Sequence, residues 1–266
     1  LDWHSAPNPM PDYYRYMPGY AANPEVAAAV REAWESRDPD VTQVNWDELY
    51  YVNRHGTATP ASYAVGGAVT ANRCFQFVSS FEYRMSGLNR LRGGVQIRND
   101  RTSRYQRLED LLGGDYLLNV DSYLIDDEYY GDKIQNDLQH PNRRVGVGER
   151  YGYDYDLDYS SYGAWVLADL HSTREAGLYG YVGGRAAQVS FYRDGRYEKE
   201  LFPGGRSLGR SDRLSFTEYL LKGGIGYMFT PSHSIEVRVA YGDVAPVADA
   251  VFLAPEYQNR TIADPR

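Results

Sequence analysis

The segment from residue 218 to residue 243 alternates apolar and polar side chains on both sides of a short turn. Its sequence is EYLLKGGIGYMFTPSHSIEVRVAYGD. A period of two is typical of β-strands, because successive side chains leave opposite faces of the backbone. Residues 230–233, TPSH, have turn chemistry, since proline fixes its own φ and lacks a ladder donor. The segment is therefore predicted to be a hairpin with one charged face and one apolar face.

Two other parts of the chain show similar alternation. Residues 73–100 predict a hairpin with its turn at 86–88, and residues 153–195 predict another with its turn near 173–177. Around Trp165, in the second of these, both faces become apolar and the parity of the strand is ambiguous. We therefore expect an all-β, antiparallel protein built from three hairpins.

The stretches that connect the hairpins are long and polar, near residues 102–150 and 194–212. Short turns at one end of a sheet and long loops at the other are typical of outer-membrane β-barrels. A soluble sandwich exposes both ends to water and has no reason to separate short connections from long ones. Loop length thus favours an antiparallel transmembrane β-barrel with long extracellular loops. The alternative is a soluble fold with its apolar faces inward.

Aromatic residues lie close to all three predicted turns. They are Phe81, Tyr83, Tyr179, Tyr181, Tyr227 and Phe229. Aromatic girdles mark the membrane interfaces of β-barrels, and 26 tyrosines against 8 phenylalanines supply rings with a polar tip. The pattern predicts a girdle on the short-turn side of a barrel. The apolar faces would then meet lipid, and the charged faces would line a wet lumen.

Charge and the length of apolar runs exclude several other classes. The formal net charge of −8 argues against a nucleic-acid partner, which needs a basic surface. A single cysteine excludes an internal disulfide framework. No stretch approaches the roughly 18 consecutive apolar residues of a membrane helix. A mean hydropathy of −0.59 suits strands that alternate.

Two short helices are expected near the start of the chain. Asn23 and Pro24 are a typical N-cap and first helical residue, and Asp38-Pro39 ends the helix that follows them. A second helix is expected over residues 45–54, NWDELYYVNR.

These patterns divide the chain into three parts. Residues 1–72 are expected to form an extracellular loop with the one or two short helices. Residues 73–252 are expected to hold the barrel strands in three hairpins, with the long loops between them. Residues 253–266 are expected to begin a further extracellular loop.

Motifs for catalysis and metal binding are weak. Asp154, Asp156 and Asp158 have the spacing that opens an EF-hand loop, but tyrosine and tryptophan stand where that loop needs glycine and glutamate. We interpret these aspartates, and the acidic run at 126–132, as solvation of the lumen or of loops. The histidines are scattered, and there is no nucleophile elbow or zincin motif. We expect no catalytic residue, no metal and no cofactor, and the chain is not expected to be an enzyme.

Eight aromatic residues fall in the predicted extracellular loops. Such rings stack on apolar or sugar-like ligands, with nearby charges fixing orientation. Alternatively, they pack the loops against one another, because large loops need small cores of their own. The candidate ligand-binding residues are Tyr13, Tyr14, Tyr16, Trp46, Tyr50, Tyr51, Tyr129 and Tyr130.

The chain resembles the barrel of TonB-dependent outer-membrane receptors in seven segments, especially the group with a carboxypeptidase-regulatory-like domain. The segments are, in order, PNPMPDYYRYMP, VNWDELYYVNR, LEDLLGGDYLLNVD, QNDLQHPNR, YGYDYDL, FYRDGRYE and KGGIGYMFT. The resemblance implies a 22-stranded barrel plugged by an N-terminal domain and powered by the TonB complex of the inner membrane. About six strands are present here, without a signal peptide, plug or TonB-contacting box, so we expect an internal fragment of a larger receptor.

The resemblance also implies a function. Extracellular loops would capture a nutrient, and a plugged barrel in the outer membrane of a Gram-negative bacterium would admit it. The expected partners are outer-membrane lipid, the receptor's own plug, the TonB complex and an unidentified solute. The alternative is a soluble all-β ligand- or carbohydrate-binding module. Residues expected to face the lumen are Glu82, Arg84, Arg90, Arg92, Arg98, Glu218, Lys222, Glu236 and Arg238.

Overall fold

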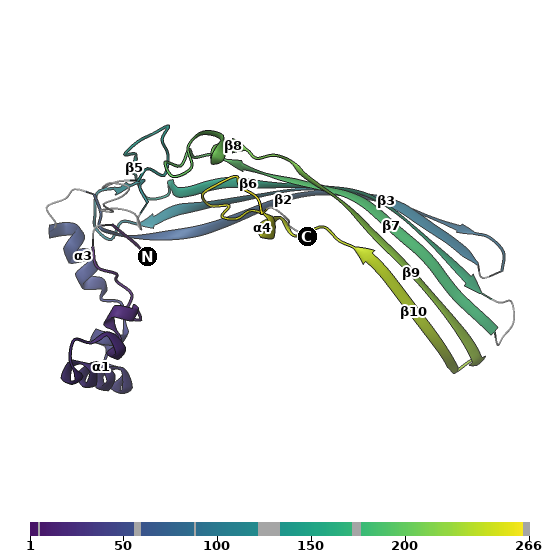
Figure 1. Ribbon diagram of the computed structural model, residues 1–266, viewed down its shortest axis with the longest axis horizontal. Helices are drawn as coiled ribbons and strands as arrows, with labels where there is room; N and C mark the ends of the chain where they lie inside the picture. Colours follow the sequence, from purple (N-terminus) through teal and green to yellow (C-terminus); the bar gives the residue numbers. More distant parts are fainter. Residues whose placement is uncertain (5, 56–59, 88, 122–133, 172–176, 263–266) are drawn as a thin grey trace. The chain divides into compact units, whose positions relative to one another are not determined.

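The computed structural model describes residues 1–4, 6–55, 60–87, 89–121, 134–171 and 177–262. Most of these residues belong to antiparallel β-sheet (Figure 1). No helix among them is long and apolar enough to cross a membrane.

Long strands make up most of the main sheet. They are β2 (Tyr63–Arg84), β3 (Arg90–Asp110), β6 (Arg150–His171), β7 (Gly177–Gly195), β9 (Leu214–Thr230) and β10 (His233–Asp243). The short strands are β1 (Asp2–Trp3), β4 (Leu117–Leu118), β5 (Arg144–Val145) and β8 (Gly209–Arg210). The main sheet has the order β1-β2-β3-β6-β7-β9-β10, with β8 paired to β7, while β4 pairs with β5 separately.

Helical segments are short and lie mostly before β2. They are the α-helices α1 (Pro24–Ser36), α2 (Pro39–Thr42), α3 (Trp46–His55) and α4 (Ala248–Val251), and the 3-10 helices η1 (Tyr14–Tyr16), η2 (Pro18–Tyr20) and η3 (Gly204–Arg206). The side chain of Asn23 accepts a hydrogen bond from the backbone N–H of Val26, at 2.9 Å. Together with Pro24 at the first helical position, it confirms the predicted start of α1.

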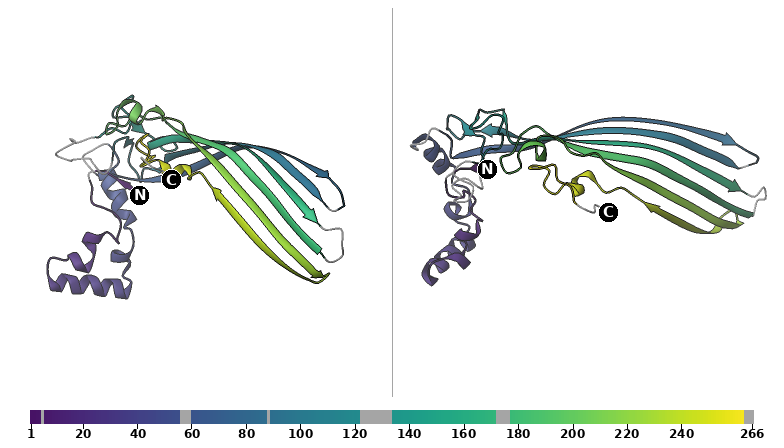
Figure 2. Two further views of the ribbon diagram at one scale, coloured as in Figure 1. Left: turned by 45° about the vertical axis from the view of Figure 1, so that its right-hand side comes forward. Right: turned by 45° about the horizontal axis from the view of Figure 1, so that its top comes forward.

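The chain forms two compact units. Unit 1 comprises Leu1–Val69, Tyr105–Asp154 and Tyr197–Pro203. Unit 2 comprises Thr70–Arg104, Tyr155–Arg196 and Gly204–Arg266. In unit 2 the long strands lie side by side in a twisted sheet (Figure 2).

The hairpin of β9 and β10 confirms the strongest prediction from the sequence. The two strands are antiparallel, with Leu221 opposite Tyr241 and Ile225 opposite Val237. They are joined by residues 231–232. The apolar residues of both strands therefore share one face of the sheet, and the charged residues share the other.

The same face continues through β7 and β6. Leu178 of β7 lies opposite Tyr227 of β9, and Leu170 of β6 lies opposite Gly180 of β7. In β3, Arg92 forms an ion pair of 2.6 Å with Asp169 of β6, which has the opposite parity to Leu170. Arg92 therefore lies on the polar face, and the odd-numbered residues of β3 lie on the apolar face.

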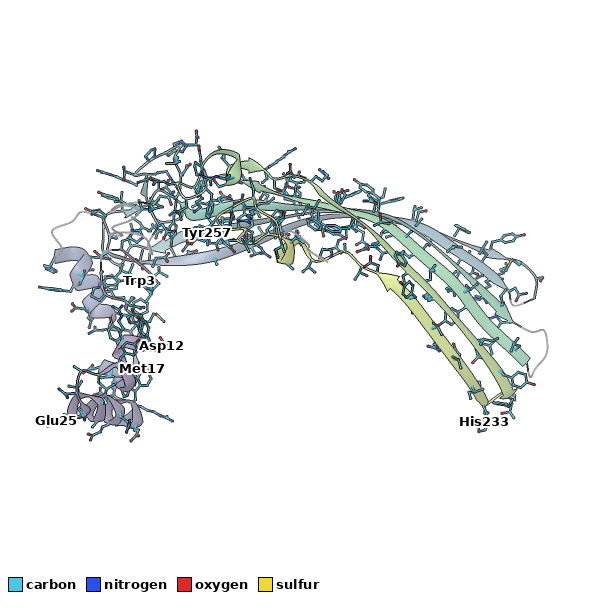
Figure 3. The ribbon with its side chains drawn as sticks, in the orientation of Figure 1. Trp3, Asp12, Met17, Glu25, His233 and Tyr257 are labelled. Carbon is cyan, nitrogen blue, oxygen red and sulfur yellow. The ribbon has the colours of Figure 1, made fainter. Side chains whose placement is uncertain are left out.

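Exposed apolar side chains lie on this face on all the long strands. Figure 3 shows side chains projecting from both faces of these strands. We call the exposed apolar set the apolar band. Its members are Phe75, Phe77, Phe81, Tyr83, Val95, Tyr162, Val166, Leu170, Leu178, Val182, Leu221, Ile225, Tyr227, Phe229, Ile235, Val237, Val239 and Tyr241.

Two of the six predicted girdle residues lie on the opposite, polar face. Tyr179 faces Gly226 and Tyr181 faces Gly224 across the β7–β9 pair. A Cβ atom at Gly224 would come within 2.7 Å of the Tyr181 ring, so the glycine leaves the space that the ring fills. The interpretation of these two tyrosines as lipid-facing is wrong, because the register of β7 places odd positions on the polar face.

Strand boundaries also differ from those expected from the sequence. β2 begins at Tyr63 rather than at residue 73, because the small residues of YAVGGAVTAN pair as a strand without an alternating signal. β3 continues to Asp110, inside the stretch expected to be a loop. The last strand ends at Asp243, and the residues after it contain α4.

Unit 1 has a core of its own. It contains Ala61, Ala64, Leu108, Leu111, Leu117, Val145 and Tyr151, which are buried together. Asn53 of α3 holds the helix to this unit, because its amide nitrogen donates to the carbonyls of Tyr63 and Leu111, each at 2.8 Å. Its amide oxygen accepts from the N–H of Ser62 at 2.9 Å. One polar side chain thus satisfies backbone groups from two separate parts of the chain.

Candidate functional site

The polar face of the unit 2 sheet carries all nine residues expected to face a lumen. The register of β9 and β10 places Lys222 opposite Ala240 and Arg238 opposite Gly224, on the face away from the apolar band. Several of these residues form ion pairs with a neighbour. Arg238 Nε lies 2.8 Å from Glu236, and Arg98 Nη2 lies 2.6 Å from Asp100.

Ion pairs also link strands on this face. Arg185 of β7 lies 3.5 Å from Glu218 of β9, and Arg90 of β3 lies 3.8 Å from Glu82 of β2. Arg84 lies 3.7 Å from the same glutamate. The result is a charged surface that carries both signs on neighbouring strands.

Residues 244–262, which we call the C-terminal strap, cover part of this polar face. Arg193 of β7 is only 2% exposed and anchors the strap. Its Nε donates to the carbonyl of Pro255, and its Nη1 donates to Oδ1 of Asn259, both at 2.6 Å. Nη1 also donates to the carbonyl of Ser207 at 2.8 Å. Burial lowers the pKa of Arg193 to about 10, so at neutral pH it remains a cation and keeps its donors.

A second contact holds the beginning of the strap. Arg104 of β3 lies 2.6 Å from Asp249 in α4, and the N–H of Ala245 donates to Oε1 of Glu218 at 3.2 Å. Val251, at the end of α4, is fully buried. The strap is therefore fixed by charge at one end and by the buried Arg193 at the other.

A cavity of 510 Å³ lies between the strap and the sheet, and we call it the strap cavity. Its lining residues are Asn72, Arg98, Asp100, Thr102, Arg104, Leu157, Tyr159, Glu218 and residues 245–249. Cavities of this size hold small solutes, and the paired charges would orient a polar one. This cavity is the candidate solute-facing site of unit 2.

Three of the predicted ligand-binding tyrosines come together in unit 1. The ring of Tyr13 lies 4.7 Å from that of Tyr14 and 5.3 Å from that of Tyr16, each edge to face. Tyr20 extends the cluster, at 4.8 Å from Tyr14. A cavity of 530 Å³ opens beside them, lined by Trp3, Ala6, Pro7, Asn8, Tyr13, Arg15 and Tyr16. This is a second candidate site, with aromatic walls and one cation.

The other predicted ligand-binding aromatics lie elsewhere. Trp46, Tyr50 and Tyr51 lie on α3, where Tyr51 stacks on His55 at 4.5 Å and Arg54 lies over the ring of Tyr50 at 5.1 Å. These contacts lie within one helix, and Trp46 and Tyr51 are exposed at 48% and 59%. Tyr129 and Tyr130 lie outside the described residues, as does the acidic run at 126–132.

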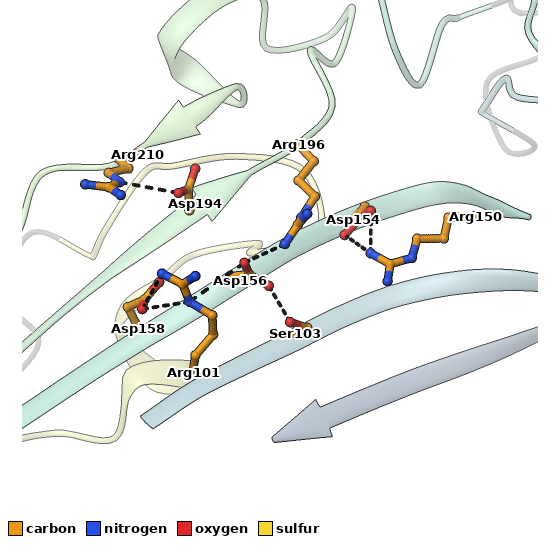
Figure 4. A network of polar contacts seen from close by, with 9 residues as sticks. All are labelled: Arg101, Ser103, Arg150, Asp154, Asp156, Asp158, Asp194, Arg196 and Arg210. Carbon is orange, nitrogen blue, oxygen red and sulfur yellow. Dashed lines mark hydrogen bonds and ion pairs between the residues drawn. The ribbon is translucent and has the colours of Figure 1, made fainter. Parts of the chain in front are cut away.

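Two of the three aspartates at 154–158, Asp156 and Asp158, do not lie on the polar face, and Figure 4 shows the side chains that they contact. Asp156 and Asp158 have the same parity as Leu170, so they follow the apolar-band face toward the long loops. Asp158 accepts from Arg101 Nη2 at 2.9 Å, and Asp156 accepts from Arg196 at 2.7 Å. These two residues therefore do not fit the lumen part of the interpretation, since arginines pair with them on the other face, while solvation of loops stays a prediction.

The third aspartate belongs to unit 1. Asp154 pairs with Arg150 at 3.0 Å, within the same strand. Among the described residues, no group of three or more histidine, cysteine, aspartate or glutamate side chains could hold a metal ion. 

The sequence did not single out Arg193 or the strap. The available signal was an arginine at the same parity as Val189 and Phe191, where an apolar residue would be expected. Its partners Ser207, Pro255 and Asn259 are 14, 62 and 66 residues away in the sequence, and no local pattern marks them.

The described part of the chain is mostly antiparallel β-sheet with short helices. No protein-family model, curated protein or solved structure matches the chain.

Proposed function

We propose that this chain is part of the barrel of a TonB-dependent outer-membrane receptor, which binds a nutrient in its loops and admits it through a plugged lumen. The observation that carries the proposal is the apolar band. Its side chains are exposed, with Leu221 at 58% and Val237 at 62%, on a sheet whose other face is charged. A contiguous apolar surface of this kind needs a cover, and monomers in water rarely expose one.

The length of the band fits a bilayer. In β9 it runs from Leu221 to Phe229 and in β6 from Tyr162 to Leu170, about nine residues in each, against the 9–11 residues of a tilted membrane-spanning strand. Beyond these limits the same face becomes polar. A sandwich core would not need this limit, because its apolar face would continue to the end of each strand.

Connection lengths support the same orientation. β9 and β10 are joined by two residues, 231–232, whereas residues 111–149 join β3 to β6 and residues 196–213 join β7 to β9. Barrels of the outer membrane place short turns on the periplasmic side and long loops outside.

The two edges of the sheet support the proposal that further strands pair with it. Within the described residues, β10 pairs only with β9, and β2 has a two-residue partner, β1, on its outer side. Unpaired backbone groups in hydrocarbon cost several kcal/mol each, so a membrane sheet must close. We propose that the other strands of the receptor complete the barrel, and that its plug meets the polar face.

Flotation tests this proposal. The full-length protein is refolded with phosphatidylcholine vesicles and centrifuged through a density gradient, with an alkaline wash to remove adsorbed protein. We expect it to float with the vesicles, and to be found in the outer-membrane fraction of cells. Protein that stays at the bottom of the gradient as a folded monomer would instead favour a soluble all-β binding module.

A further inference from the structure

On the apolar-band face, side-chain chemistry changes in layers toward the long loops. The first layer after the band has uncharged polar groups, where Ser190 of β7 lies opposite Ser160 of β6 and Ser215 of β9. In the same layer the hydroxyl of Thr217 donates to Gln188 at 3.0 Å. The charged residues follow only after these.

Four arginines form the next layer, and we call them the arginine belt: Arg101, Arg196, Arg210 and Arg213. Arg101 lies on β3 and Arg210 on β8, whereas Arg196 directly follows β7 and Arg213 directly precedes β9. Two of them lie over Tyr192, which is 8% exposed. Arg210 and Arg213 lie over its ring, at 5.3 and 4.8 Å from the centroid. Arg213 also donates to Ser190 at 3.1 Å, which places it on the same face.

In each ion pair of the belt, the cation lies outside and the carboxylate beneath it. The side chain of Arg101 is 46% exposed while that of Asp158 is 16% exposed, and Arg196 is 49% exposed over Asp156 at 5%. Asp156 is held further by Ser103, whose hydroxyl donates to it at 2.5 Å.

The third pair follows the same rule. Arg210 is 68% exposed and Asp194 is 32% exposed, with 3.4 Å between them. Although the pairs are nearly neutral in sum, the surface they present outward is therefore cationic. The carboxylates, which are less exposed than their arginines, hold the guanidinium groups in place, which lowers the entropy lost when a ligand binds.

The position of the belt indicates its ligand. Asp158 lies four residues from Tyr162, the last member of the band in β6, which is about 13 Å along the strand and about 9 Å along the normal of a bilayer if the strand is tilted by about 45°. Headgroups occupy the layer immediately outside the hydrocarbon. Guanidinium groups match phosphate oxygens in geometry as well as charge.

We propose that the arginine belt binds the phosphate groups of anionic lipid headgroups at the loop-side surface of the membrane. This inference rests on the proposed function, since it needs the apolar band to lie in the bilayer. The belt would fix the height and tilt of the barrel, because it holds a charged layer of the protein at the level of the lipid phosphates.

Native mass spectrometry of the full-length protein in detergent measures this binding directly. The probe is phosphatidic acid, with phosphatidylcholine as the zwitterionic comparison and inorganic phosphate as a competitor. The belt variant is Arg101→Gln, Arg196→Gln and Arg210→Gln together. The matched control, Arg31→Gln, Arg84→Gln and Arg238→Gln, removes the same charge from exposed arginines away from the belt.

We expect the belt variant to bind phosphatidic acid about tenfold more weakly, while the control changes by less than about twofold. Lysine at the three belt positions should restore part of the binding, which a purely structural role of arginine would not. Equal weakening in both variants would overturn the proposal. Competition by inorganic phosphate at the same concentration as the lipid would also overturn it, because the site would then prefer free phosphate.

The outcome is separable from that of the proposed function. Wild-type protein that fails to float with vesicles refutes membrane insertion and with it the belt. If the protein floats normally but binds phosphatidic acid no better than phosphatidylcholine, only the lipid-binding role of the arginine belt is refuted.

Discussion

Val237 lies directly opposite Ile225 in the β9–β10 pair, and both side chains are more than half exposed, at 62% and 56%. In water, two apolar side chains that lie opposite each other and are exposed to solvent at the edge of a sheet would favour aggregation. In hydrocarbon they are the expected arrangement, because lipid tails cover them.

Arginine substitutions can test which face of the sheet meets lipid. Val237→Arg or Leu221→Arg in the full-length receptor should destabilise it by roughly 2–4 kcal/mol near the bilayer midplane. Ala240→Arg is the control. Ala240 lies on the polar face opposite Lys222, so this substitution should change the free energy of unfolding only slightly. Urea titration of the protein refolded in lipid measures the difference. Equal costs on the two faces would refute the assignment of the apolar band to lipid.

Topology can be tested by proteolysis. Protease added to intact cells should cut within residues 8–62 and 134–149, because the first range leads into β2 and the second lies between β3 and β6, both on the loop side. The turn at 231–232 and the predicted turn at 86–88 should be cut only after the outer membrane is opened. Early cleavage at either turn would reverse the proposed orientation.

The packing of Tyr181 on Gly224 predicts a specific steric conflict. Gly224→Ala should destabilise the sheet by about 1–3 kcal/mol, because the new methyl group meets the ring. Gly205→Ala is the control, as nothing lies within 4 Å of a Cβ there. Adding Tyr181→Ala should remove most of the penalty of the Gly224 variant. If the double variant shows no such relief in urea titration, the contact does not set the cost.

The strap should depend on Arg193. Arg193→Met leaves the carbonyls of Ser207 and Pro255 without their buried donor, which should cost about 2 kcal/mol or more and release residues 251–262. Hydrogen exchange across the strap measures the release. Arg260→Gln, an exposed change in the same segment, should leave exchange slow; equal acceleration in both would contradict the anchoring role.

We expect His4 to make the stability of unit 1 depend on pH. Burial lowers the pKa of His4 below 6.5, although Asp2 and Asp121 oppose the shift. The unfolded chain therefore binds a proton more readily than the folded one, so stability is complete above about pH 6.5 and falls as the pH drops below it. Protection of residues 2–4 from hydrogen exchange, corrected for intrinsic rates, should decrease over that range in the wild type. It should change less in His4→Gln, and a loss of the same size in both would exclude His4 as the cause.

Local patterns were enough to predict the β9–β10 hairpin and α1. In both, the information lies within a few residues: strict alternation around a proline turn, and an asparagine cap before a proline. The face of Tyr179 and Tyr181 could not be predicted in the same way. Apolar residues occupy both parities around Trp165, and a shift by one residue moves every side chain to the other face.

Long-range contacts account for the rest. The strap cavity depends on Arg104 meeting Asp249, and the anchor depends on Arg193 meeting Asn259. Neither pair leaves a periodic or spaced signal in the sequence. The arginine belt has the same origin, because its members become neighbours only through the pairing of separate strands and the path of the segments beside them.

Sedimentation of this 266-residue chain without detergent tests the central claim most directly, because it asks whether the apolar band meets lipid or another part of the protein. Exposed on an open sheet in water, the band should drive association. We predict that the chain aggregates, or needs detergent or lipid to remain dispersed. A compact, monodisperse monomer near 30.2 kDa that melts cooperatively would contradict the account, since its apolar side chains would then be covered from within.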